Sequence, residues 1–72
     1  MGEIIKQIVA ETLNTDVDAI TDDFDLSSCE EWDSLAQVIV LQRLEEELGV
    51  TVSYDDLIGL STLSDLVKLA NA

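Results

Sequence analysis

The sequence contains 72 residues, of which 16 are acidic, 3 are basic and none is histidine, and its net charge at neutral pH is −13. This charge argues strongly against a nucleic-acid ligand, because phosphate binding requires clustered lysine and arginine, and equally against an anionic membrane surface. With no histidine and one cysteine, the chain has none of the usual Ser-His-Asp, Cys-His or zinc sites. We therefore predict no catalytic residue and no metal site.

The length and composition predict a single all-α domain over residues 1–72. Leu, Ile and Val are plentiful and proline is absent, which suits a small bundle of three to four helices with one long loop. The apolar run Val38–Leu41 is too short to cross a bilayer, and the start of the sequence does not resemble a signal peptide. Because Cys29 is the only cysteine, we expect no intrachain disulfide and a location in the cytoplasm. We also expect the chain to be a monomer.

The first predicted helix runs from about Glu3 to Leu13. Its expected buried side consists of Ile4, Ile5, Ile8, Val9, Thr12 and Leu13, and its exposed side of Glu3, Lys6, Gln7 and Glu11. A long polar connection, Asn14–Asp33, follows this helix. Because a loop of this length in a small domain is usually functional or anchored, we expect apolar side chains to hold it against the bundle, namely Val17, Ile20, Phe24 and Leu26.

The connection contains a cluster of acidic residues, Asp22, Asp23 and Asp25. They do not form an EF-hand loop, because glycine and glutamate would be needed where Ser28 and Ser34 stand. We expect the crowding of these carboxylates, and of the consecutive Glu45–Glu47, to raise their pKa values and to destabilise the fold at low salt. Acidic neighbours are likewise expected to raise the pKa of the Cys29 thiol.

The strongest predicted helix extends from about Ser34 to Leu48. Asp33 is a good N-cap, because its carboxylate can accept the free backbone N–H groups of the first turn, and Gly49 can adopt the left-handed conformation that ends a helix. The expected core stripe consists of Val40, Leu44 and Leu48, with Leu41 beside them and Gln37 at the edge. The opposite ridge carries Leu35, Ile39, Gln42 and Glu46.

Two shorter helices are predicted after this one, over about Ser53–Ile58 and Leu63–Ala70. Both begin with the spacing of a capping box, formed by Ser53 with Asp56 and by Thr62 with Asp65. The expected buried stripe of the last helix consists of Leu63, Leu66, Val67 and Ala70.

The segment Asp33-Ser34-Leu35, at the head of an acidic amphipathic helix, resembles the attachment site of the acyl carrier protein family. The resemblance covers nearly the whole chain and includes the ending Glu45-Glu46-Glu47-Leu48-Gly49-Val50 of that helix. It implies that Ser34 carries 4'-phosphopantetheine, flanked by Asp33 and Leu35, and that the chain is not itself an enzyme. A phosphate ester on Ser34 would lie at the positive end of the helix dipole.

The resemblance also implies a function and partners. The chain would hold acyl or aminoacyl groups as thioesters and present them to biosynthetic enzymes, such as those of fatty acid or polyketide biosynthesis. The implied partners are a phosphopantetheinyl transferase, an acyl ligase or acyltransferase, and synthase enzymes with basic docking surfaces. We expect docking by Leu35, Ile39, Gln42 and Glu46, flanked by Glu30 and Glu31. Arg43, beside this ridge, is expected to meet an acidic residue of a partner.

One departure from the family pattern concerns the substrate class. Many members have Gly-Ala or Gly-Gly before the modified segment, whereas this chain has Glu31-Trp32. Because peptide-synthesis carriers commonly show Gly-Gly there, we favour an acyl carrier and keep a peptidyl or D-alanyl carrier as the alternative. Two other classes stay open, an acidic interaction module whose Ser34 is never modified and a small metal-buffering protein.

Overall fold

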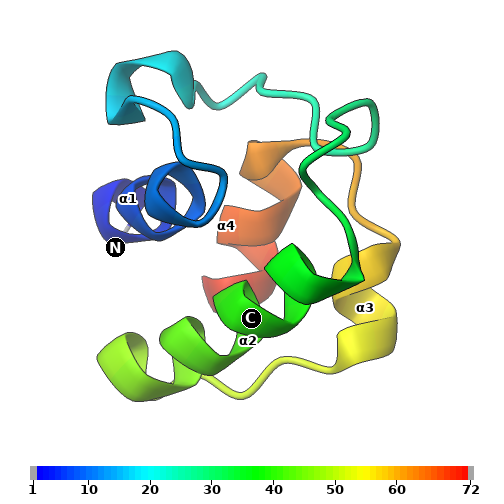
Figure 1. Cartoon of the computed structure of the whole chain (residues 1–72). Helices are drawn as coiled ribbons and strands as arrows, with labels where there is room; N and C mark the ends of the chain where they lie inside the picture. Colours follow the sequence, from blue (N-terminus) through cyan, green and yellow to red (C-terminus); the bar gives the residue numbers. More distant parts are fainter. Residues whose placement is uncertain (1, 72) are drawn as a thin grey trace.

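The computed structural model describes residues 2–71, which form a small helical bundle (Figure 1). The elements in chain order are α1 (Gly2–Thr12), the short 3₁₀ helix η1 (Val17–Ala19), α2 (Ser34–Leu48), α3 (Tyr54–Ile58) and α4 (Leu63–Asn71). Within residues 2–71 there is no strand, only an isolated antiparallel bridge between Asp25 and Thr62. The predicted all-α architecture with a long loop between the first two major helices is confirmed.

The buried side of α1 is rotated slightly from the predicted one. Ile5, Ile8 and Val9 are buried as expected, but Ala10 is buried too and Ile4 is 41% exposed. The buried arc therefore extends toward Ala10, which leaves Ile4 beyond its opposite edge. Thr12 is half-buried and its hydroxyl donates to the Ile8 carbonyl at 2.8 Å, so its polar group is satisfied within the helix.

Apolar residues of the long loop complete the core, as predicted for most of them. Ile20 and Leu26 are buried, and Phe24 is partly buried against the core. The same segment is tied to the start of α4 by backbone hydrogen bonds, in which Leu26 N–H donates to Ser61 O at 2.8 Å and Leu63 N–H donates to Phe24 O at 3.0 Å. The loop is thus an integral part of the fold, which fixes the path of the chain toward α2.

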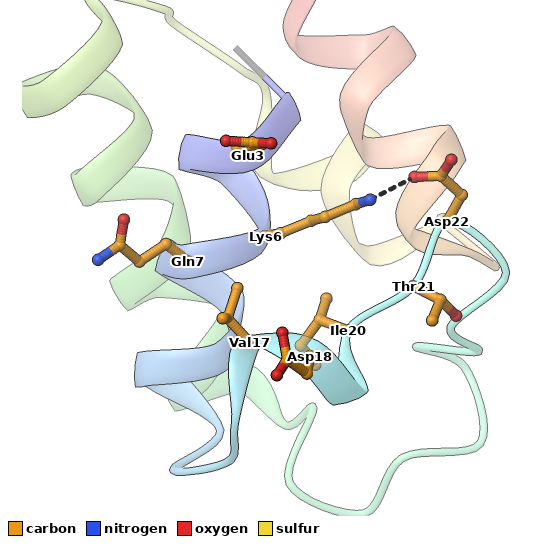
Figure 2. Close-up of a pocket in the computed structure, with 8 residues that line it drawn as sticks. All are labelled: Glu3, Lys6, Gln7, Val17, Asp18, Ile20, Thr21 and Asp22. Atoms are coloured by element: carbon orange, nitrogen blue, oxygen red, sulfur yellow. Dashed lines mark ion pairs between the residues drawn. The ribbon is translucent and has the colours of Figure 1, made fainter.

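Val17 does not anchor the loop, contrary to the prediction. It is 45% exposed, because it opens η1 and lines an open hollow of about 680 Å³ between α1 and the loop (Figure 2). The other lining residues are Glu3, Lys6, Gln7, Asp18, Ile20, Thr21 and Asp22. Lys6 spans the hollow and forms an ion pair with Asp22 at 2.9 Å, so a charge contact rather than Val17 joins this part of the loop to α1. None of the predicted site residues lines the hollow.

The ends of the helices follow their local sequence, with one exception. Gly49 ends α2 with φ +65°, and its N–H bonds to the carbonyls of the last turn. Thr62 and Asp65 form the predicted reciprocal capping pair, each donating a backbone N–H to the other's side chain at 3.3 Å. Ser53 precedes α3, but its side chain forms no cap hydrogen bond. Acidic residues in the first turn of α3, Asp55 and Asp56, supply the favourable charge at that end instead.

Two of the three basic side chains form ion pairs with carboxylates in the described part of the chain. Arg43 on α2 binds Glu11 on α1 and Glu47 one turn along α2, and its Nη2 lies 2.6 Å from Glu47 Oε2. These two carboxylates raise the pKa of the guanidinium. Arg43 therefore joins α1 to α2, which is a different role from the predicted contact with a partner.

The prediction of raised carboxylate pKa values is wrong for Asp25. Its side chain accepts hydrogen bonds from the hydroxyl and the backbone N–H of Ser27, at 2.6 and 3.0 Å. Hydrogen bonds from the Ser27 and Ser28 side chains lower the pKa of Asp25 below its ordinary value, because they favour the charged form. Local hydrogen bonding outweighs the opposing effect of burial on the pKa of Asp25.

Salt is still expected to stabilise the fold, because a net charge of −13 on 72 residues produces repulsion that ions screen. Melting followed by circular dichroism should show a Tm that rises with NaCl, by roughly 4–8 °C for each kcal/mol of repulsion removed. The exposed Glu45→Gln variant should melt higher at low salt and respond less to salt. A Tm that is flat or falls across the series would contradict the prediction.

Candidate functional site

The start of α2 is built by Asp33. Its backbone is extended, with φ −98° and ψ −176°, and its carboxylate accepts the N–H of Ala36 at 2.9 Å. Its carbonyl accepts the N–H of Gln37 at 3.0 Å. The predicted N-cap is confirmed, and it holds the first turn of α2 in place. By helix geometry, the N–H groups of Ser34 and Leu35 have no carbonyl one turn earlier within α2.

Ser34 is the first residue of α2 and is exposed to solvent. Its hydroxyl is therefore open to another molecule, at the end of the helix where the dipole and free N–H groups favour a phosphate. The chain contains no histidine that could remove the hydroxyl proton, and the Asp33 carboxylate is used by the helix cap. The geometry at Ser34 therefore favours a phosphate ester on its hydroxyl.

Trp32, two residues before Ser34, is a core residue with only 8% of its surface exposed. Its backbone N–H donates to Cys29 O at 3.1 Å, and its carbonyl accepts Nε2 of Gln37 at 3.5 Å. Gln37 Oε1 in turn accepts the Tyr54 hydroxyl of α3 at 3.3 Å. These contacts connect the segment before Ser34 to α2 and α3. They also provide the partners of Gln37, which the sequence did not reveal.

The indole nitrogen of Trp32, unlike its backbone groups, has no hydrogen-bond partner in the described part of the chain. Within residues 2–71, Trp32 Nε1 is the one side-chain nitrogen or oxygen atom that is buried without a hydrogen-bond partner. An unpaired buried donor costs roughly 1–3 kcal/mol, and such groups are rare in folded proteins. Trp32 is not among the predicted site residues, although its place two residues before Ser34 is visible in the sequence.

Cys29 is half-buried, and its thiol donates to Glu31 Oε2 at 3.3 Å. Burial raises the pKa of the thiol, and the hydrogen bond to Glu31 raises it further. The predicted direction is confirmed, but burial is the largest cause rather than negative neighbours. A thiol with a raised pKa is a poor nucleophile at neutral pH.

The predicted docking residues of α2 lie on its solvent-facing side. Leu35 is 68% exposed, and Ile39, Gln42 and Glu46 are exposed as well. Val38, which is not among the predicted docking residues, is also exposed and lies on the same side by helical spacing. Two more exposed apolar residues, Tyr54 and Ile58, belong to α3.

The surroundings of this face are acidic. Glu30 and Glu31 are exposed just before α2, as predicted. Arg43 does not contribute a free positive charge, because it binds Glu11 and Glu47. Exposed apolar residues beside Ser34 with carboxylates around them are suited to contact with a basic partner, and the docking role of these residues stays a prediction.

Two further findings concern membrane-spanning helices and metal-binding clusters. No helix within residues 2–71 combines the length and the apolar character needed to span a bilayer. The same residues contain no group of three or more Cys, Asp or Glu side chains that could hold a metal ion.

Comparison with known proteins agrees with this geometry. The family model described as "Phosphopantetheine attachment site" matches residues 3–70. The chain is 33% identical over 67 residues to the "Polyketide-8 synthase acyl carrier protein 2" of Streptomyces avermitilis, which covers 93% of this chain and 77% of that protein. It is also 33% identical over 67 residues to an "Acyl carrier protein" of Petrotoga mobilis, covering 93% and 79%. A third relative, an "Acyl carrier protein" of Saccharopolyspora erythraea, is 34% identical over 67 residues, covering 93% and 70%.

The small helical fold is that of a carrier that bears a prosthetic group. The chain belongs to the acyl carrier protein family, and it is a carrier protein with covalently attached 4'-phosphopantetheine. The residues fit this group, because the hydroxyl of Ser34 is accessible and the first turn of α2 offers N–H groups to a phosphate.

Proposed function

We propose that Ser34 is the attachment residue and that the chain presents acyl groups as thioesters to biosynthetic enzymes without catalysing a reaction itself. The observation that supports this most directly is the exposed Ser34 hydroxyl on the first residue of α2, held there by the Asp33 cap. Leu35 follows Ser34 and is open to solvent, where it can contact the enzyme that performs the modification.

The attachment reaction assigns clear roles to the residues. The Ser34 oxygen forms a bond to the β-phosphorus of coenzyme A, and 3',5'-adenosine diphosphate leaves with the electrons of the broken bond. The proton of the hydroxyl goes to a base of the phosphopantetheinyl transferase, because the chain has no histidine to take it and Asp33 caps the helix with one carboxylate oxygen. Once attached, the group supplies the thiol on which acyl groups are held as thioesters.

The proposed partners are this transferase, an acyl ligase or acyltransferase, and synthase enzymes with basic docking surfaces. The net charge of −13 would attract such surfaces over a distance and raise association rates. We further propose that residues 1–72 act as one carrier domain, monomeric and cytoplasmic. The relatives are named as acyl carrier proteins, which supports an acyl group over an amino acid as the cargo.

Mass spectrometry after incubation with a broad-specificity transferase and coenzyme A tests the attachment site. The native chain should gain one phosphopantetheinyl group, located on the peptide that contains Ser34, and Ser34→Ala should gain none. Ser53→Ala is a matched control, because Ser53 also precedes a helix, is exposed and forms no cap hydrogen bond. Modification of Ser34→Ala, or an unmodified native chain, would overturn the proposal.

A further inference from the structure

We propose that the buried indole N–H of Trp32 is a hydrogen-bond donor for a carbonyl oxygen of the group carried on Ser34. This inference rests on the proposed attachment at Ser34. The acceptor is an amide carbonyl of the prosthetic arm or the carbonyl of the thioester, two sources of the same chemistry that can be separated by experiment.

The donor is buried and has no partner in the protein. Trp32 is more than nine-tenths buried, and its Nε1 has no acceptor among residues 2–71. The indole nitrogen can only donate, so an acceptor must supply an oxygen with a free lone pair. The backbone groups of Trp32 are paired with Cys29 and Gln37, so the unpaired atom is confined to the side chain.

The position of Trp32 relative to Ser34 makes the carried group a suitable source of this acceptor. Only Asp33 separates the two residues, and its backbone is extended. A group attached to Ser34 therefore starts two residues along the chain from Trp32, and its flexible arm contains carbonyl oxygens.

Packing alone does not account for a tryptophan here. Trp32 belongs to a core whose other buried members are aliphatic, and a phenylalanine would supply an aromatic ring without leaving a donor unpaired. A donor that lacks a partner in the protein but lies beside an attachment residue is what a site for the carried group requires. The pairing would favour a folded-back arm over one extended into solvent.

Nuclear magnetic resonance of the indole provides a direct test, because the chain contains a single tryptophan and so gives one indole signal. The ¹⁵N-labelled chain is compared in four forms: unmodified, with the free-thiol arm, with an S-butyryl arm, and with an S-butyl arm that has the same chain length but no thioester carbonyl. Mass spectrometry establishes the loading of each form independently.

Two results would support the proposal. The first result is that the indole proton shifts downfield and exchanges with solvent about tenfold more slowly in all three loaded forms. This result would identify an amide carbonyl of the arm as the acceptor. The same changes only in the S-butyryl form would identify the thioester carbonyl. In either case loading should raise the Tm of the native chain, because the arm then binds the folded state, and Trp32→Phe should lose this rise.

Other results would overturn it. An indole signal unchanged by loading would show that the donor has another partner, such as a buried water, and equal changes in the S-butyryl and S-butyl forms alone would show only an apolar contact. Both leave the attachment at Ser34 intact. Failure to load Ser34 would instead overturn the proposed attachment and this inference together. The four forms of the native chain test the proposal on their own, even if Trp32→Phe does not fold.

Discussion

Replacing Leu44 with alanine is expected to lower the free energy of unfolding by about 2–5 kcal/mol. Leu44 is completely buried in the middle of α2, so the change removes apolar contacts and leaves a cavity in the core. Small domains have little stability to lose, with a total of roughly 0.05–0.15 kcal/mol per residue. We therefore expect Leu44→Ala to be substantially unfolded at 37 °C.

Leu35→Ala is the matched control for this experiment. It is the same substitution on the same helix, but Leu35 is 68% exposed, and surface changes of this kind usually alter stability by about 0.5 kcal/mol or less. Urea unfolding followed by far-UV circular dichroism measures both variants. Equal losses of stability would show that the buried and exposed sides of α2 are wrongly assigned.

The ends of α2, where the candidate attachment residue lies, were predictable from sequence because their geometry is local. Asp33 caps the N–H of a residue three positions later, and Gly49 ends the helix through bonds to its own last turn. Both contacts lie within a few residues, where the identity of the side chain determines what the backbone can do. The start and length of α2 and the burial of Val40 and Leu44 followed from these features and from the helical period, whereas Leu48 is only partly buried and the buried Ala36 was not predicted.

Contacts between distant segments were not predictable in this way. Arg43 binds Glu11, which lies 32 positions earlier, and Gln37 accepts the Tyr54 hydroxyl from α3. Pairing of this kind depends on how the helices pack, which the local pattern does not specify. Arg43 was therefore assigned to a partner, although it connects two helices of the chain itself.

The errors at the edges of the core have a related cause. Ile4 and Val17 are apolar and close to buried residues, but each lies just outside the contact surface. Hydrophobicity indicates which side chains can be buried, and the exact rotation of a helix decides which of them are. Trp32 is buried, unlike Ile4 and Val17. The sequence does not reveal that its indole nitrogen lacks a hydrogen-bond partner among residues 2–71, and only the structure shows this.

Replacing Ile39 with glutamate is expected to slow transfer by a cognate acyl ligase or synthase by about tenfold or more, which corresponds to about 1.4 kcal/mol of lost binding. Ile39 is 37% exposed on the solvent-facing side of α2, one turn from Leu35, so a charge there would disrupt an apolar contact beside Ser34. The loss should appear mainly in KM, because docking precedes the chemistry.

The fold should tolerate this change, since Ile39 lies outside the buried stripe of Ala36, Val40 and Leu44. Tm and kcat/KM are measured on the same preparations, with Gln7→Glu as the control. That variant adds an equal charge at an exposed position of α1, so it reports the effect of net charge alone and should leave transfer nearly unchanged. If both variants slow transfer equally, charge and not docking is responsible. If Ile39→Glu unfolds the chain while the folded fraction reacts at the native rate, Ile39 is a core residue and the docking surface lies elsewhere.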